Sequence, residues 1–198
     1  MKKIIILVLG VFLLTSCAKQ EHAKEKIEED VKLLSGKHNV VINVKDYGEI
    51  ELELDADIAP ITVTNFINLV EEGFYNGLTF HRIIEDFMIQ GGDPNHDGSG
   101  GSSKKIKGEF AENGVGNTIK HVRGVVSMAR SNDPDSASSQ FFIVQEDSPH
   151  LDRKYAAFGH VIKGMKVVDK IVKDADPIDD NGTVLYEEQP VIESIKVN

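Results

Sequence analysis

Apolar and polar residues alternate through most of the chain after Asn39, which is the pattern of half-buried β-strands. Two alternating runs, Val41–Val44 and Ile50–Leu54, flank the turn sequence Lys-Asp-Tyr-Gly and predict a β-hairpin. Six further runs have the length and apolar content of short strands: Thr79–Ile84, Phe87–Gln90, Gly124–Ala129, Gln140–Gln145, Ala156–Ile162 and Val191–Val197.

Two segments repeat apolar residues at helical spacing instead. The first begins at Pro60 and ends before Gly73, as expected for an amphipathic helix. Its apolar stripe is Val63, Phe66, Ile67 and Val70. The second covers Gly164–Ala175. Its residues expected to face inward are Val167, Val168, Ile171 and Val172.

The order of these elements predicts a mainly β fold. A parallel βαβ sheet needs a helix after each strand, whereas here one helix comes early and one late. We therefore expect an eight-stranded antiparallel closed barrel capped by two α-helices. The stretches 92–103 and 131–139 are rich in Gly, Ser and Asp and predict loops beside strands, where ligand contacts often lie.

The N-terminus has a different pattern. Lys2 and Lys3 precede an uninterrupted apolar run of 11 residues, Ile4–Leu14, which is short of the roughly 20 that a bilayer-spanning helix needs. The run ends in Leu-Thr-Ser-Cys, which resembles the lipobox of bacterial lipoproteins. A buried strand with a stray thiol would not explain this order of basic, apolar and small residues. We predict a signal peptide at 1–16 and lipidation, with palmitate among the acyl groups, at Cys17.

Residues 17–37 are predicted to form the lipidated cysteine and a polar tether, followed by a folded domain at 38–198. A docked helix is the alternative for part of the tether, because Ile27, Val31 and Leu34 have helical spacing. Acyl chains would anchor the mature protein to a membrane outside the cytoplasm of a bacterium. Cys17 is the single cysteine, so the folded domain has neither a disulfide nor a thiol nucleophile.

Composition narrows the choice of partners. The 198 residues are 40% hydrophobic and 27% charged, which is typical of one soluble domain with a short additional segment. We expect this domain to be monomeric. The formal net charge of −10 would repel phosphate backbones. Nucleic acid is therefore an unfavourable partner.

One charged residue stands out in the segment Phe80–Gly101, which reads FHRIIEDFMIQGGDPNHDGSGG. Arg82 lies among large apolar residues, where a guanidinium must be paired, reach water or face a ligand. A salt-bridged surface arginine and a ligand-binding arginine fit this local sequence about equally well. Phe87 and Met88 taken singly are ordinary core residues.

Other chemistries fit the glycine-rich loop poorly. Asp93–Gly98 matches the start of an EF-hand loop, but Lys104 occupies the twelfth position, where a Glu is needed. Asp97–Gly101 resembles a serine protease signature with two residues transposed. A catalytic triad brings together groups that are far apart in sequence, whereas His81 and this segment lie close together along the chain. Phosphate-binding and zinc-binding spacings are missing from the sequence, so we expect no metal and no cofactor.

Three separated segments carry a family resemblance. FHRIIEDFMIQGGD, SMARSNDPDSASSQFFIVQ and HLDRKYAAFGHVIKGMKVVDKI resemble the cyclophilin-type peptidyl-prolyl cis–trans isomerases, in family order, over Asn39–Asn198. The resemblance implies the same eight-stranded barrel with two helices. It also implies the activity, which is rotation about X–Pro peptide bonds.

The resemblance assigns roles residue by residue. Arg82 matches the catalytic arginine, and Gln90 matches the glutamine beside it. The pocket for the proline ring is implied at Phe87, Met88, Phe142 and Leu151. The groove for residues preceding proline is implied at Gly98, Ala129, Arg130, Ser131 and Gln140.

Three positions depart from the common family pattern. Arg130 replaces a frequent asparagine, whose contact is largely through the backbone. His150 replaces a frequent tryptophan, which implies weak inhibition by cyclosporin. Tyr155 replaces a histidine that lines the proline pocket. All three are retained as expected substrate-binding residues.

These expectations combine into one interpretation. We expect a membrane-tethered isomerase that binds proline-containing segments of exported proteins and assists their folding. The alternative is a chaperone or scaffold module that binds such segments with little turnover.

Overall fold

The computed structural model describes residues 32–198. Every predicted strand and helix of the folded domain is confirmed, with ends shifted by a few residues. The β-strands are β1 (Lys37–Val44), β2 (Gly48–Asp55), β3 (Phe80–Ile84), β4 (Met88–Gly91), β5 (Val125–Met128), β6 (Phe141–Val144), β7 (Ala157–Lys163) and β8 (Ile192–Val197). The α-helices are α2 (Pro60–Glu71) and α3 (Met165–Asp174). Three short 3-10 helices, which the sequence pattern did not predict, are η1 (Ala111–Asn113), η2 (Pro149–Leu151) and η3 (Tyr186–Glu188).

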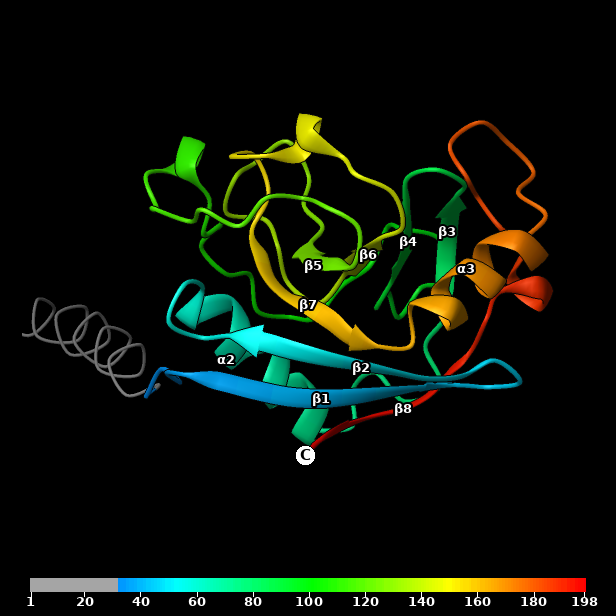
Figure 1. Cartoon of the computed structure of the whole chain (residues 1–198), viewed down its shortest axis with the longest axis horizontal. Coiled ribbons are helices and arrows are strands. Elements are labelled where there is room, and N and C mark those ends of the chain that lie inside the picture. The colour runs from blue at the N-terminus through cyan, green and yellow to red at the C-terminus, as the bar shows by residue number, and fades with distance from the viewer. Residues whose placement is uncertain (1–31) are drawn as a thin grey trace, which may run out of the picture. The chain divides into compact units, whose positions relative to one another are not determined.

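The strands form one curled antiparallel sheet in the order β3-β4-β6-β5-β7-β2-β1-β8 (Figure 1). Its two end strands, β3 and β8, are brought together at one point. Thr79 forms an isolated antiparallel bridge with Val191, and the amide of Phe80 donates to the carbonyl of Pro190 at 3.0 Å. The eight predicted antiparallel strands therefore form a curled half-barrel whose two ends meet at this bridge and its neighbouring hydrogen bonds.

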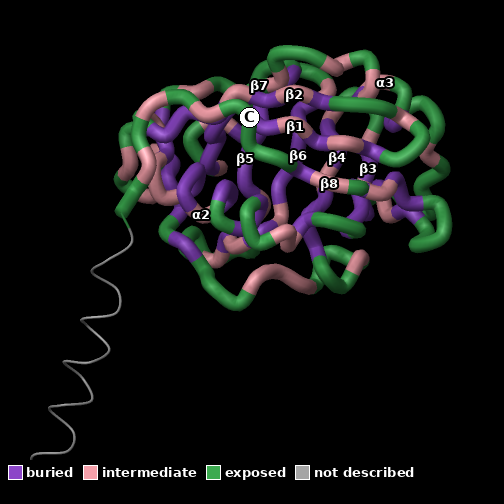
Figure 2. Tube along the Cα trace, turned by 90° about the horizontal axis from the view of Figure 1, so that it is seen from below, coloured by how far each residue is buried: buried purple, intermediate pink, exposed green. Residues whose placement is uncertain are grey.

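The main core lies on the inner face of the curled sheet. Alternate residues of β1 and β2, among them Val40, Ile42 and Leu52, are fully buried there, as strand geometry requires. Figure 2 shows buried segments concentrated in the strands and exposed ones in the loops. Phe66 of α2 contributes to an aromatic cluster with Phe141, the two rings lying edge to face at 5.4 Å.

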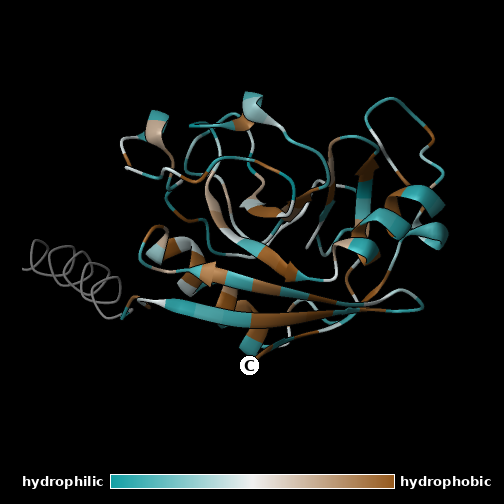
Figure 3. Cartoon of the chain, in the orientation of Figure 1, coloured by the Kyte–Doolittle hydropathy of each residue, from teal (hydrophilic) through white to brown (hydrophobic). Residues whose placement is uncertain are grey.

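The two helices cover different parts of the sheet. All four residues of the predicted stripe on α2 are buried, and the helix packs against β2 and β8. The helix α3 packs against β2 through Val168, Ile171 and Val172. Val167 was predicted to face inward as well, but it is only partly buried at the helix margin. Figure 3 shows α3 as largely hydrophilic, as expected for a helix with a narrow apolar stripe.

Packing of the domain begins a few residues before β1. Leu34 packs against the core, and its amide donates to Oγ1 of Thr64 at 2.9 Å. The amide of Gly36 donates to Oδ1 of Asp57 at 2.7 Å. Residues 34–37, the end of the segment predicted as a tether, thus belong to the folded domain. The predicted signal peptide, Cys17 and most of the predicted tether lie outside the described residues.

Within residues 32–198, neither helix combines the length and the apolar run that crossing a bilayer requires.

Candidate active site

A row of polar and aromatic side chains crosses four neighbouring strands on the face of the sheet opposite the main core. Arg82 of β3 is paired with Gln90 of β4, Gln90 with Phe142 of β6, and Phe142 with Ser127 of β5. Directly opposed side chains on antiparallel strands are about 5 Å apart. The strand register therefore brings together residues that are up to 60 positions apart in sequence.

The side chain of Arg82 is held on two sides. Its Nε donates to the carbonyl of Asn181 at 2.7 Å, and Nη1 donates to Oε1 of Gln90 at 3.2 Å. Sδ of Met88 lies 4.0 Å from Nη1, and the centroid of the Phe87 ring lies 6.0 Å from Cζ. The remaining nitrogen, Nη2, has no hydrogen-bond partner among the described residues.

Partial burial lowers the pKa of the Arg82 guanidinium from its ordinary value, while Tyr155 and Asp179 raise it. An arginine nevertheless stays charged throughout the physiological range. Arg82 is therefore an oriented cation with one free donor group. Its setting differs from the salt-bridged surface arginine considered above, because no carboxylate of residues 32–198 forms an ion pair with it.

The loop after α3 supplies the contact to Nε. Its turn is held by Asp179, whose Oδ1 accepts from the amide of Thr183 at 2.9 Å. Gly182 has φ +82°, and a Cβ there would lie 2.5 Å from the carbonyl oxygen of Ile83. Only glycine fits this close approach to β3, and the approach brings the carbonyl of Asn181 within reach of Arg82.

An apolar pocket of about 140 Å³ opens beside Arg82. Met88, Phe142 and Leu151 are almost completely buried and belong to a hydrophobic cluster separate from the main core. The predicted proline pocket is thus assembled as one cavity. Its lining residues are Arg82, Phe87, Met88, Gln90, Ala129, Arg130, Phe142, Leu151 and Tyr155.

His121 supports the pocket from behind, a role that sequence reasoning missed. Its ring stacks on Phe142 with centroids 6.1 Å apart and an interplanar angle of 19°. The ring nitrogens contact Oγ of Ser127 at 3.0 Å and Oδ1 of Asp152 at 3.3 Å. Burial lowers the pKa of His121, and the contact with Asp152 opposes this shift. The histidine thereby fixes the ring that forms the pocket floor.

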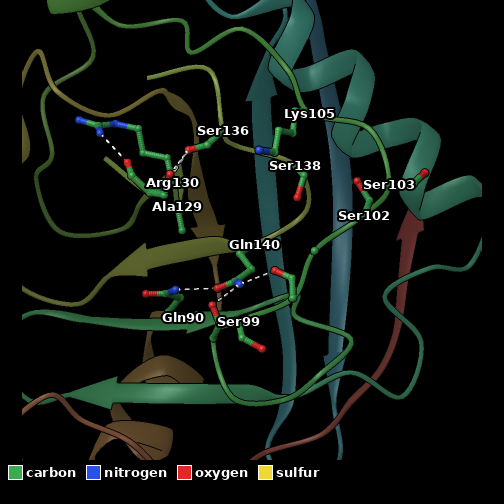
Figure 4. Close-up of a pocket in the computed structure, with 14 residues that line it drawn as sticks. Gln90, Ser99, Ser102, Ser103, Lys105, Ala129, Arg130, Ser136, Ser138 and Gln140 are labelled. Atoms are coloured by element: carbon green, nitrogen blue, oxygen red, sulfur yellow. Dashed lines mark hydrogen bonds between the residues drawn. The ribbon is translucent and has the colours of Figure 1, made fainter. Parts of the chain in front are cut away.

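A larger polar groove of about 410 Å³ adjoins the apolar pocket and shares three of its lining residues, Gln90, Ala129 and Arg130 (Figure 4). Nε2 of Gln90 donates to Oε1 of Gln140 at 2.8 Å. Nε2 of Gln140 donates in turn to the carbonyls of Gly98, at 3.0 Å, and Gly100, at 2.8 Å. One hydrogen-bonded chain therefore runs from Arg82 to the glycine-rich loop.

Arg130 turns its charge away from this groove. Nε and Nη2 donate to the carbonyl of Lys154, and Nη1 donates to that of Ser131. The guanidinium lies between the rings of Phe110 and Tyr155, with centroids 5.0 and 4.7 Å from Cζ. At this position the groove wall is therefore formed by the backbone and the side-chain stem of Arg130, and the guanidinium points elsewhere.

The other two departures lie at the pocket margin. Tyr155 lines the pocket and meets Phe142 edge to face, with centroids 5.9 Å apart. His150 is exposed, and its ring packs on Phe87 with centroids 5.3 Å apart. His150 is the one predicted substrate-binding residue that lines neither the pocket nor the groove.

The residues considered for other chemistries have structural roles. Asp93 is fully buried, and its carboxylate accepts from the amides of Asn95 at 2.8 Å and Gly98 at 2.6 Å. His81 is buried beneath this loop, and neither ring nitrogen has a hydrogen-bond partner within residues 32–198. Ser99 donates its amide to Asp97 and does not contact His81.

Comparison with known proteins identifies the arrangement. Residues 39–197 match the family described as cyclophilin type peptidyl-prolyl cis-trans isomerase/CLD. A peptidyl-prolyl cis-trans isomerase A from Dickeya dadantii is 46% identical over 129 residues, covering 63% of this chain and 66% of that protein. A probable peptidyl-prolyl cis-trans isomerase from Brucella suis is 42% identical over 159 residues, covering 74% of this chain and 76% of that protein.

A solved structure agrees with the architecture. A cyclophilin type peptidyl-prolyl cis-trans isomerase from Cryptosporidium parvum, crystallised in the presence of the dipeptide Ala-Pro, superimposes with a TM-score of 0.70 at 31% identity. The match covers 81% of this chain and 98% of that one.

Proposed function

The chain belongs to the cyclophilin-type peptidyl-prolyl cis–trans isomerase family, and on this basis we propose that it accelerates rotation about X–Pro bonds in exported proteins at a membrane surface, assisting their folding. Its substrates in this proposal are proline-containing segments of polypeptides that have crossed the cytoplasmic membrane. The Cryptosporidium relative was crystallised with Ala-Pro, which supports an X–Pro unit as the group bound here.

The reaction defines what a catalyst must supply. Partial double-bond character separates the cis and trans forms of an X–Pro bond by roughly 18–20 kcal/mol. No covalent bond forms or breaks during rotation. In the twisted transition state the prolyl nitrogen loses its resonance with the carbonyl, becomes pyramidal and gains a lone pair that accepts a hydrogen bond. A donor that reaches this nitrogen stabilises the transition state more than either planar form.

The observation that carries the proposal is the free Nη2 of Arg82 at the edge of the apolar pocket. The contacts with Asn181 and Gln90 fix the guanidinium in advance, so little reorganisation is needed when the lone pair develops. Phe142, Met88 and Leu151 would hold the proline ring while the preceding carbonyl moves. Their low-polarity surroundings strengthen the interaction with the cation.

The export and membrane parts of the proposal are supported by the sequence before the domain. The basic start, the apolar run of Ile4–Leu14 and the Leu-Thr-Ser-Cys motif are the features of a lipoprotein precursor. Mass spectrometry of the full-length chain recovered from a bacterial host tests this. We expect loss of residues 1–16 and acyl groups on Cys17. An unprocessed, unmodified N-terminus would contradict the membrane-anchored form.

The catalytic part is tested by replacing Arg82. We expect Arg82→Ala to lower kcat/KM on a short X–Pro peptide by about 10²–10³-fold, the loss typical of removing one preorganised donor. Arg82→Lys should recover little activity because lysine lacks the planar fork. Arg123→Ala is the matched control, since Arg123 pairs with Asp169 on the exposed surface.

Wild-type protein that is no faster than Arg82→Ala would exclude catalysis through Arg82. Retained peptide binding in that case would favour the alternative, a chaperone or scaffold module that holds proline-containing segments.

A further inference from the structure

We propose that Lys105 makes the polar groove selective for an acidic residue, Asp or Glu, two positions before the proline of the substrate. The inference rests on the proposed function, because it takes the apolar pocket as the site of the proline ring. Lys105 lies in the loop between β4 and β5, outside the strands that carry the row from Arg82 to Ser127.

The charges that line the groove are all positive. Lys105 and Arg130 are the two charged residues of its wall, and no carboxylate belongs to it within the described part of the chain. Arg130 is already occupied by the carbonyls of Lys154 and Ser131. Lys105 is exposed and forms no ion pair or hydrogen bond within residues 32–198. In Figure 4 its ammonium group points into the groove beside Ser138.

The groove also offers a hydroxyl donor. Ser138 lies beside Lys105 in Figure 4, and its hydroxyl has no hydrogen-bond partner in the described chain. A carboxylate accepts hydrogen bonds only, and it forms its strongest ones with charged donors. An ammonium with a free hydroxyl nearby therefore suits a carboxylate better than an amide or a second cation.

Two acidic side chains in the loops around the groove, Asp97 and Asp135, bond to other groups and form no ion pair with Lys105. Asp97 accepts from the amide of Ser99 at 2.8 Å. Asp135 accepts from the amide of Gly108 at 3.0 Å and from Nδ2 of Asn113 at 2.8 Å. Both carboxylates stabilise their own loops. The chain as a whole carries a net charge of −10 and repels acidic peptides, so a local preference for them must come from this cation.

The spacing of the two cavities selects the substrate position. Alternate residues of an extended peptide project on the same side and are about 7 Å apart. The groove and the apolar pocket share a wall formed by Gln90, Ala129 and Arg130. They therefore accept successive side chains on one side of the peptide, which belong to residues two positions apart. With proline in the pocket, the residue two positions earlier faces Lys105.

The test compares three peptides that differ only at this position, with Glu, Gln or Lys two residues before proline. Isomerisation is measured on the full-length protein by NMR exchange, which avoids a coupling protease with its own charge preference. We expect kcat/KM to be about two- to fivefold higher for Glu than for Gln, the range that exposed ion pairs allow, and lowest for Lys. The preference should shrink in 0.5 M NaCl because salt screens exposed charges.

Substitution at Lys105 assigns the preference to this side chain. Lys105→Gln should abolish the difference between Glu and Gln peptides, and Lys105→Glu should favour the Lys peptide. Lys104→Glu is the matched control, because it changes the net charge equally at an exposed neighbour that does not line the groove. A preference for Glu that survives in Lys105→Glu, or no preference in the wild type, would overturn the inference.

A binding measurement distinguishes a failure of this inference from a failure of the proposed function. The same three peptides are titrated into the protein and followed by fluorescence anisotropy. Charge-dependent binding without turnover would support the role of Lys105 while rejecting catalysis. Normal turnover that is indifferent to peptide charge would do the reverse.

Discussion

Gln90 connects the cation of the site to its polar groove: Oε1 accepts from Nη1 of Arg82 at 3.2 Å, and Nε2 donates to Gln140 at 2.8 Å. An amide is the side chain that can do both, because it carries an acceptor and a donor group on one planar unit. Orientation of the guanidinium and the position of the groove wall are therefore coupled through one residue.

Replacing Gln90 tests this coupling. Gln90→Ala should lower kcat by about tenfold or more, because a misplaced catalytic group costs up to roughly 100-fold, while binding of the proline ring is largely retained. Gln90→Glu keeps the acceptor for Arg82 but loses the donor to Gln140, so it should retain more of kcat than Gln90→Ala. Separate determination of kcat and KM by NMR exchange checks both variants. A change confined to KM would argue against an orienting role.

The loop that carries Asn181 gives a second prediction. Asp179→Ala removes the acceptor for the amide of Thr183, which should loosen the turn and let the carbonyl of Asn181 move away from Nε of Arg82. We expect a several-fold fall in kcat with a smaller change in KM. Asp180→Ala is the control, since Asp180 is exposed and its side chain forms no hydrogen bond in the described chain. Equal activities of the two variants would contradict a positioning role for this loop.

The strands and the pocket could be predicted from the sequence because they depend on side-chain pattern. Apolar alternation located β1 to β8, and the resemblance placed Arg82, Gln90 and Phe142, which the register then brings into one row. The contact from Asn181 could not be predicted this way. It is made by a backbone carbonyl, which is the same in every residue, and its position depends on the tight turn at Gly182.

Two other features depended on three-dimensional packing. His121 lies 21 residues before Phe142 in sequence, and only the pairing of β5 with β6 explains why its ring stacks there. The direction of the Arg130 guanidinium follows from two aromatic rings that come from separate loops. Neither interaction leaves a periodic signal in the sequence.

His150 leads to a third prediction. Its exposed ring packs on Phe87 at the margin of the apolar pocket, where a tryptophan would extend the apolar surface. His150→Trp should therefore increase the affinity for cyclosporin, measured as inhibition of isomerisation, while kcat on a short X–Pro peptide changes little. His160→Trp, at an exposed position of β7, controls for a general effect of adding a surface tryptophan. Equal inhibition of both variants would show that the His150 position does not limit cyclosporin binding.

His81 gives the protein a pH-dependent stability. Its ring is 3% exposed and its nitrogens have no hydrogen-bond partner in the described chain. Burial lowers the pKa of His81 from the ordinary value of 6.5, Arg82 and His96 act in the same direction, and Asp93 and Asp97 oppose them. The unfolded chain therefore binds a proton at a higher pH than the native protein does. The free energy of unfolding must fall as the pH drops below about 6.5, by at most about 1.4 kcal/mol per pH unit for this one group.

Replacing His81 by leucine should make the pH dependence less steep. Urea denaturation of the wild type and His81→Leu between pH 5 and pH 8 measures the effect as the difference in slope. At pH 8 the variant should be as stable as the wild type or more stable, because an unpaired buried polar group has been replaced by an apolar one. His121, whose pKa is also lowered by burial, leaves a residual slope of the same sign in both proteins. His160→Leu is the control, because it changes an exposed histidine and should keep the wild-type slope. An unchanged slope in His81→Leu would mean that the His81 ring is already protonated or solvated in the native state.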